Sequence, residues 1–334
     1  MTMLADPLRE ARRAVHSGRF QNAAGLLDSA DAAARDGAEW QLLSAMTAWR
    51  LGRFAPSRAA AVAARNAYRT AGDADGEMRS ENVAAAGAFA LGDLEEAERG
   101  FSRALLLARR LGDGLLGARG ANNLGNVAFY LARHDEAMSY YRLANAEFER
   151  LAFPHGLAET WINLGFVSRD LKDMRGALDA AERALDAAER AGQPRLVAQA
   201  LVSRGEAQAA LGDAALGRAQ VERGLAMARA EADRLAEAEA LRVLSGIARD
   251  AGDLAGAERL GRDALAVATA MNHPWTIAEV QRDLGGVYAA GNRAAEASGA
   301  YGAAADHFLR LGSVPRAERM QAMAEQWRSR NLGA

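Results

Sequence analysis

The sequence predicts an all-α solenoid, in which pairs of antiparallel helices stack one on the next. The chain repeats every 40 residues between Leu91 and Ala297, and a fixed period of this length is typical of stacked helical repeats. Within each period two stretches carry apolar residues at helical spacing, and turn-forming residues separate them. A small residue recurs in the first stretch, at Ala45, Ala85, Gly125, Gly165, Gly205, Ser245 and Gly285. We expect it to lie where the two helices of a pair come closest.

The period is expected to run through one domain, residues 1–334, because no linker-like stretch interrupts it. Two shorter helix pairs are predicted over residues 4–72, and six repeats of 40 residues follow over residues 73–312. Residues 313–331 carry an apolar stripe, with arginines and glutamates opposite: Ala317, Met320, Ala324 and Trp327. This stripe predicts one amphipathic helix that caps the end of the stack.

The turn inside each repeat is marked by residues that end one helix and begin the next. Gly92 and Gly252 stand where a left-handed residue ends the first helix, and Asp93 and Asp253 follow as caps of the second. Asn292 takes the place of the glycine in the last repeat, which fits because asparagine also adopts the left-handed conformation. Each repeat is therefore expected to read helix, short turn, helix, short turn.

The composition of the chain excludes some classes of partner and favours one cellular compartment. The net charge is −2, with acids and arginines interspersed, which argues against nucleic acid or an anionic membrane as the main partner. There are no cysteines, so disulfides and thiol chemistry are excluded. The N-terminus lacks the apolar core of a signal peptide, and no stretch approaches the roughly 18 apolar residues of a membrane helix. We expect a cytoplasmic protein without a membrane partner, and its preference for arginine over lysine fits a GC-rich bacterial genome.

The helix–turn–helix unit resembles the tetratricopeptide repeat. The matching residues are Leu124, Gly125, Ala137, Tyr141 and Ala144, then Leu164, Gly165, Ala177 and Ala184, then Leu284, Gly285, Ala297, Tyr301 and Ala304. The resemblance covers nearly the whole chain, although the period is longer than the commoner one of about 34 residues. It implies a right-handed superhelix whose first helices line a concave groove. It also implies a scaffold for proteins or peptides, because that is what most members of the family are.

Polar and aromatic residues gather on the side of three first helices that is expected to face the groove. They are Asn82, Arg119, Asn122, Asn123, Asn126, Phe129, Tyr130, Asn163, Phe166 and Arg169. Asparagine is a poor helix former, so a cluster of asparagines inside helices calls for a reason. One reason is that their amides bind the backbone of an extended peptide. The alternative is that they bond to the neighbouring helix and stabilise the stack.

Two further sets of residues lie on the same expected face. Toward the N-terminus the set is apolar, and it is either a pocket for a hydrophobic anchor or a contact with the first, shorter helix pair: Leu42, Met46, Trp49 and Phe89. Toward the C-terminus the set is charged: Glu239, Arg242, Arg249, Glu279, Arg282 and Asp283. Glu239 and Arg242 are three positions apart on one helix, as are Glu279 and Arg282, so each pair can form an ion pair. We expect this charged set to be a solvated, self-neutralised face.

Signals for catalysis are lacking in the sequence. The five histidines are isolated from one another, and none has the spacing of a metal-binding pair. Neither a phosphate-binding loop with its lysine nor a G-x-S-x-G motif occurs. RNA recognition by helical repeats needs a basic face, which is also missing. We therefore expect a protein without enzyme activity, metal or cofactor that binds a protein or peptide segment in the concave groove. The alternative is a regulatory sensor of a bacterial signalling or transcription pathway, whose superhelix changes pitch when a peptide or small ligand binds.

Overall fold

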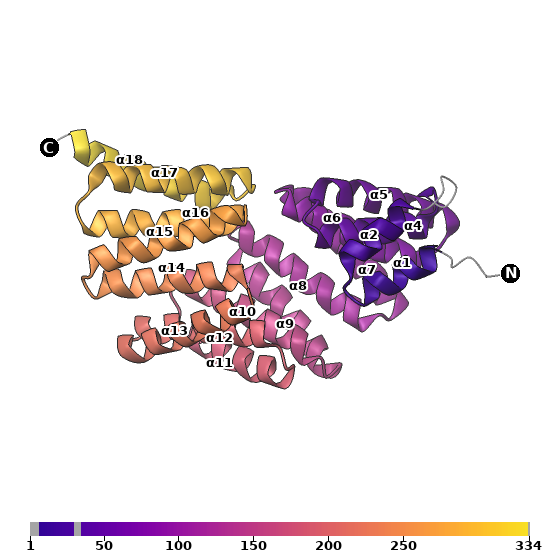
Figure 1. The fold of residues 1–334 in the computed structure, drawn as a ribbon, viewed down its shortest axis with the longest axis horizontal. Helices are drawn as coiled ribbons and strands as arrows, with labels where there is room; N and C mark the ends of the chain where they lie inside the picture. The colour runs from indigo at the N-terminus through magenta and orange to yellow at the C-terminus, as the bar shows by residue number, and fades with distance from the viewer. Residues whose placement is uncertain (1–6, 30–34, 333–334) are drawn as a thin grey trace. The chain divides into compact units, whose positions relative to one another are not determined.

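The computed structural model describes residues 7–29 and 35–332, and across these residues seventeen helices follow one another without a strand (Figure 1). The predicted all-α fold of paired helices is confirmed. The chain divides into two compact units, Met1–Val127 and Ala128–Ala334, which we call the N-terminal unit and the C-terminal unit. The single domain over residues 1–334 stays a prediction. In the described ranges, no helix is long and apolar enough to cross a membrane.

The N-terminal unit contains three helix pairs and most of a further helix. The helices are α1 (Pro7–His16), α2 (Phe20–Asp28), α4 (Ala38–Arg50), α5 (Phe54–Ala71), α6 (Ala74–Ala90), α7 (Leu94–Leu111) and α8 (Gly114–Tyr130), which reaches into the C-terminal unit. Helices α1 and α2 pack on α4 around buried Ala14, Val15, Leu27 and Leu43. Residues 4–6 and 30–34 of the predicted N-terminal pairs lie outside the described residues.

The C-terminal unit is a stack of helix pairs followed by one further helix. The helices are α9 (His134–Arg150), α10 (Pro154–Asp170), α11 (Met174–Arg190), α12 (Pro194–Ala210), α13 (Ala214–Ala230), α14 (Arg234–Asp250), α15 (Leu254–Ala270), α16 (Pro274–Ala290), α17 (Ala294–Arg310) and α18 (Val314–Leu332). Each of α10, α12, α14 and α16 packs along the helix that follows it, and α18 packs on α17. The core of this stack includes Leu241, Leu244, Tyr301 and Phe308.

The turns follow the signals in the sequence. Gly252 has a φ of 83°, and the side chain of Asp253 accepts a hydrogen bond from the backbone N–H of Gly256 at the start of α15. Asn292 adopts the left-handed conformation that its position predicts, with a φ of 54°. Turn and capping residues of this kind recur from pair to pair. They therefore set the length and spacing of the helices that carry the site.

The small residues of the first helices do not all lie at equally close contacts. A Cβ atom on Gly205 would lie 2.5 Å from the carbonyl oxygen of Gly217, so these two helices come too close together for a side chain. A Cβ atom on Gly165 would lie 3.8 Å from both the Ala177 carbonyl and the Ala180 side chain, which is ordinary contact. The expectation of a very close approach is therefore met at Gly205, whereas the contact of Gly165 with its partner helix is looser. Gly205 faces a glycine of the partner helix, Gly217, whereas Gly165 faces an alanine, Ala177.

Candidate functional site

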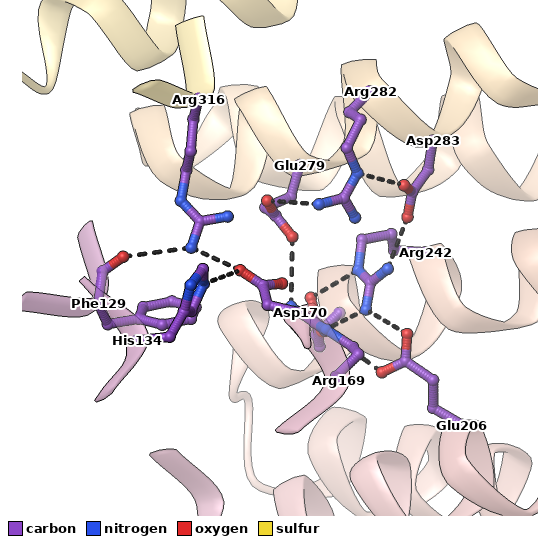
Figure 2. Close-up of polar contacts among 11 residues, drawn as sticks. Phe129, His134, Arg169, Asp170, Glu206, Arg242, Glu279, Arg282, Asp283 and Arg316 are labelled. Atoms are coloured by element: carbon purple, nitrogen blue, oxygen red, sulfur yellow. Dashed lines mark hydrogen bonds and ion pairs between the residues drawn. The ribbon is translucent and has the colours of Figure 1, made fainter. Parts of the chain in front are cut away.

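Seven charged residues from four first helices of the C-terminal unit meet in one network (Figure 2). We call them the charge network: Arg169 on α10, Glu206 on α12, Glu239 and Arg242 on α14, and Glu279, Arg282 and Asp283 on α16. Their helices are separated in sequence by second helices. The network therefore forms because the repeat turns the same side of each first helix toward a common interior, which we call the inner face.

Arg169 joins its helix to the three first helices that follow. Its Nη1 atom lies 3.3 Å from a carboxylate oxygen of Glu206 and 3.2 Å from one of Glu239. Its Nη2 atom lies 3.3 Å from Glu279, which stands 110 positions later in the chain. One guanidinium thus links α10 with α12, α14 and α16.

Arg242 is the most buried arginine of the network, with 4% of its side chain exposed. It donates to Glu239 at 2.6 Å, to Glu206 at 3.0 Å and to Asp283 at 2.6 Å. Arg282 completes the network by pairing with Glu279 and Asp283, both at 2.8 Å. Three guanidiniums therefore face four carboxylates, and ion pairs join all seven groups.

The arginines hold two of these carboxylates, Glu239 and Asp283, in the ionised form. Burial by itself raises the pKa of Glu239, but Arg242 and Arg169 outweigh burial and lower the pKa to about 2. In the same way Arg282 and Arg242 hold the pKa of Asp283 far below its ordinary value, against the effect of burial. Glu239 and Asp283 therefore keep their negative charges over the whole physiological range of pH.

The predicted pairing of Glu239 with Arg242 and of Glu279 with Arg282 is confirmed, and the predicted solvation of this face is wrong. The Glu279 side chain is 3% exposed and pairs with Arg169 of α10 and Arg282 of its own helix. Glu206 is not among the residues predicted for this face from the sequence. A signal was present, since Glu206 stands 40 positions after Phe166, a residue already assigned to the groove.

A second cluster joins the last helix of the C-terminal unit to its first residues. Arg316 on α18 lies 2.5 Å from the Asp170 carboxylate and donates to the carbonyl of Phe129 at 3.2 Å (Figure 2). Ser313 donates from its hydroxyl to the carbonyl of Tyr130. His134 also faces Asp170, with Nε2 3.4 Å from the carboxylate. We call these residues the α18 anchor.

Aromatic rings surround the α18 anchor. The Arg316 guanidinium lies over the ring of Phe129 at 4.7 Å and over that of Trp275 at 5.1 Å. Tyr130 stacks on Trp275 with 3.8 Å between ring centroids, and burial raises the pKa of its hydroxyl. Phe129 is 6% exposed. Two of the three predicted groove aromatics, Phe129 and Tyr130, thus pack against side chains of the chain itself.

The predicted site residues belong to both units. In the C-terminal unit, Arg169 joins the charge network, its guanidinium lies over the Phe166 ring at 5.1 Å, and Asn163 is half-buried on α10. In the N-terminal unit, Asn82 lies on α6, and Arg119, Asn122, Asn123 and Asn126 lie on α8. Asn123 donates from its amide to Asn82 at 3.4 Å, which is the helix-to-helix bond that the alternative interpretation expected.

In the apolar set of the N-terminal unit, Met46 fits one of the two interpretations, and the pocket for a hydrophobic anchor stays a prediction. Met46 packs against the buried cluster formed with α1 and α2, as expected of a contact with the first helix pair. Trp49 is 36% exposed and lies beside the guanidinium of Arg50. Among the described residues, no group of three or more histidine, aspartate or glutamate side chains is arranged to hold a metal ion.

Comparison with known proteins found one matching family model and several solved structures with a similar fold. A family model described as tetratricopeptide repeat matches residues 77–144. No curated protein compared with the sequence matches it. A Rap protein complexed with competence and sporulation factor is 13% identical, with a TM-score of 0.64 over 97% of each chain. The apo form of the quorum sensor NprR from B. thuringiensis is 14% identical, with a TM-score of 0.64 over 96% of this chain and 86% of that chain. NprR in complex with its cognate peptide NprX is 12% identical, with a TM-score of 0.64 over 97% of each chain.

Stacked helix pairs with charged and aromatic residues on the inner face define a helical-repeat protein. The match of the family model over residues 77–144 and the likeness of fold support a tetratricopeptide-type repeat protein. At 12–14% identity, the likeness to the solved structures is one of fold.

Proposed function

We propose that this chain is a non-enzymatic binding protein, and that the inner face of its C-terminal unit takes up a segment of a peptide or protein. The observation that carries the proposal is the charge network. Burying ion pairs costs desolvation energy, and well-packed apolar residues often stabilise a fold equally well. A purely structural role therefore does not explain seven charged residues on one face. Recognition of a polar segment does explain them.

The chemistry of the inner face suits an extended segment with charged side chains. The guanidiniums and carboxylates are held in fixed positions, so they can exchange their partners for charges on the segment with little loss of side-chain entropy. The amide of Asn163 can donate to and accept from a peptide backbone. In the N-terminal unit, Asn82, Arg119, Asn122, Asn123 and Asn126 offer similar groups, and we propose them as a second binding surface. The similar structures named for a bound factor and a bound peptide support this class of partner.

The α18 anchor favours a second candidate function, that of a peptide-responsive sensor. Arg316 and Ser313 hold the start of α18 against Phe129, Tyr130 and Asp170. A ligand that binds better to the released form than to the anchored form would shift the equilibrium toward release. The same inner face would then report binding by a change in the position of α18 within the C-terminal unit.

The proposal is tested by selecting peptides from a displayed random library against the full chain. We expect a recurring sequence pattern among the selected peptides. Binding should fall about tenfold or more in a variant with Asn163→Ala and Phe166→Ala, since a peptide amide left unpaired costs about 1–3 kcal/mol. The matched control is Leu143→Ala with Leu309→Ala, two exposed residues of second helices. Selected peptides that bind the inner-face variant as well as the wild type would contradict the proposal.

For the sensor, spin labels at introduced cysteines would report the distance between α18 and α10, because the chain has no cysteine of its own. A distance that changes when a selected peptide binds supports the sensor. An unchanged distance supports a rigid scaffold.

A further inference from the structure

A groove of about 700 Å³ lies between helices α9, α10 and α11 of the C-terminal unit. Its floor is apolar and consists of Pro154, Leu157 and Trp161 from the first turns of α10. Its walls are charged side chains of α9 and α11. Neither the charge network nor any predicted groove residue lines it. The volume is in the range of sites that bind ligands, which is roughly 300–1,000 Å³.

Trp161 differs from its counterparts in the following repeats. The residues 40 and 80 positions later are Leu201 and Leu241, which are 1% and 4% exposed. Trp161 is only half-buried, although it packs at the edge of a core cluster. This repeat therefore has a larger apolar side chain and leaves part of it open to the groove. Tryptophan is enriched among the residues that dominate binding energy at protein interfaces.

The walls of the groove carry more negative than positive charge. On α11, Arg183 pairs with Asp179 at 3.0 Å and Arg190 pairs with Asp186 at 2.9 Å. Two more carboxylates line the groove, Glu149 on α9 and Glu182 on α11, and both are exposed. Four carboxylates thus face two guanidiniums. Arg183 also lies over the Trp161 ring at 4.8 Å, which shows that the ring accepts a guanidinium.

We propose that this groove binds a basic segment of a partner protein. An apolar side chain of the segment covers Trp161 and Leu157, and lysine or arginine side chains on either side pair with Glu149 and Glu182. An apolar floor within a charged rim is the usual layout of a protein interface. The surplus of carboxylates selects a basic segment over an acidic one. This site shares no residue with the inner face, so its test does not depend on the function proposed above.

The probe is a synthetic peptide in which one leucine lies between two pairs of lysines, titrated into the full chain by calorimetry at low ionic strength. We expect saturable binding that weakens as salt is added, because exposed charges are screened. Trp161→Leu should weaken binding about thirtyfold, the scale of an interface hot spot. This variant keeps the repeat packing, because leucine is the residue at Leu201 and Leu241; an unchanged melting temperature checks this.

A charge variant and a control complete the test. The double variant Glu149→Gln with Glu182→Gln should weaken binding by up to about fivefold for each lost pair. Glu189→Gln, an exposed residue of α11 that does not line the groove, should leave binding unchanged. The proposal is overturned by any of four results: no saturable binding, unchanged binding by Trp161→Leu, equal binding of a peptide with glutamates in place of the lysines, or equal binding of the tetra-amine spermine.

Discussion

Replacing Arg242 with methionine tests whether the charge network holds the C-terminal unit together. Arg242 contacts three carboxylates, and its side chain is 4% exposed. Methionine keeps much of the length of the side chain and removes its charge. The change leaves four carboxylates facing the two remaining guanidiniums, Arg169 and Arg282. The cost therefore comes mainly from buried carboxylates that have lost their partner.

We expect Arg242→Met to lower the free energy of unfolding by about 3–5 kcal/mol, the usual cost of removing one partner from a buried ion pair. This is a large share of the roughly 5–15 kcal/mol that stabilises a typical domain. The control is Arg218→Met on α13. Arg218 is 3.9 Å from Glu222, and their side chains are 42% and 56% exposed. Exposed pairs contribute about 0–1 kcal/mol, so the control should unfold almost like the wild type.

The pH dependence of the difference identifies its cause. Glu239 has an ordinary pKa of 4.5 and a pKa of about 2 in the folded protein. A carboxylate with a lowered pKa stabilises the fold above its ordinary pKa, and this contribution is lost as pH falls toward the folded value. Wild type and Arg242→Met should therefore differ most at neutral pH and converge between about pH 4.5 and pH 2.

The assay is urea unfolding followed by circular dichroism at neutral and acidic pH. Adding Glu239→Gln to Arg242→Met should restore part of the lost stability, because it removes one of the surplus buried charges. A loss of less than about 1 kcal/mol at neutral pH, as for exposed pairs, would refute the reasoning. A difference that does not change with pH would also refute it.

Three further outcomes follow from the packing. Gly205→Ala should lower stability by about 1–3 kcal/mol in thermal unfolding, because its Cβ would lie 2.5 Å from a carbonyl oxygen. The Cβ of Gly165→Ala would lie 3.8 Å from its nearest neighbours, so this variant should be neutral or up to about 1 kcal/mol more stable. Ser245→Ala should cost about 1 kcal/mol in the same assay, because its buried hydroxyl donates to the Ala257 carbonyl at 2.7 Å. Asn123→Ala should change stability by less than about 1 kcal/mol, since the lost 3.4 Å bond to Asn82 is offset by better helix propensity. Capture of a selected peptide that binds the surface of the N-terminal unit should fall.

The elements of the fold could be predicted because their signals are local and repeated. The 40-residue period and signals such as Gly252, Asp253 and Asn292 mark the ends of helices, and the helices end there. The spacing of Glu239 and Arg242 likewise predicted a pair, because residues three apart are neighbours on any helix.

The burial of the charge network and the α18 anchor could not be read from the same signals. Ser313 and Tyr130 are 183 positions apart, and Arg169 and Glu279 are 110 apart. Whether such residues meet depends on the small rotation from one repeat to the next, summed over several repeats. Helical periodicity places each residue on a face of its own helix, but it does not determine the total rotation between helices several repeats apart. For this reason the charged face was expected to be solvated, and Arg316 was not singled out.

The central claim is that a peptide or protein segment binds on the inner face of the C-terminal unit, and crosslinking tests it most directly. A photoreactive phenylalanine derivative in place of Phe166 would lie on that face, and the same derivative in place of Leu143 would lie on an exposed second helix. Each protein is irradiated with a peptide selected against the wild type, and the products are separated by mass. The account predicts a crosslink at position 166 and none at position 143. A crosslink at position 143 with none at position 166 would contradict it.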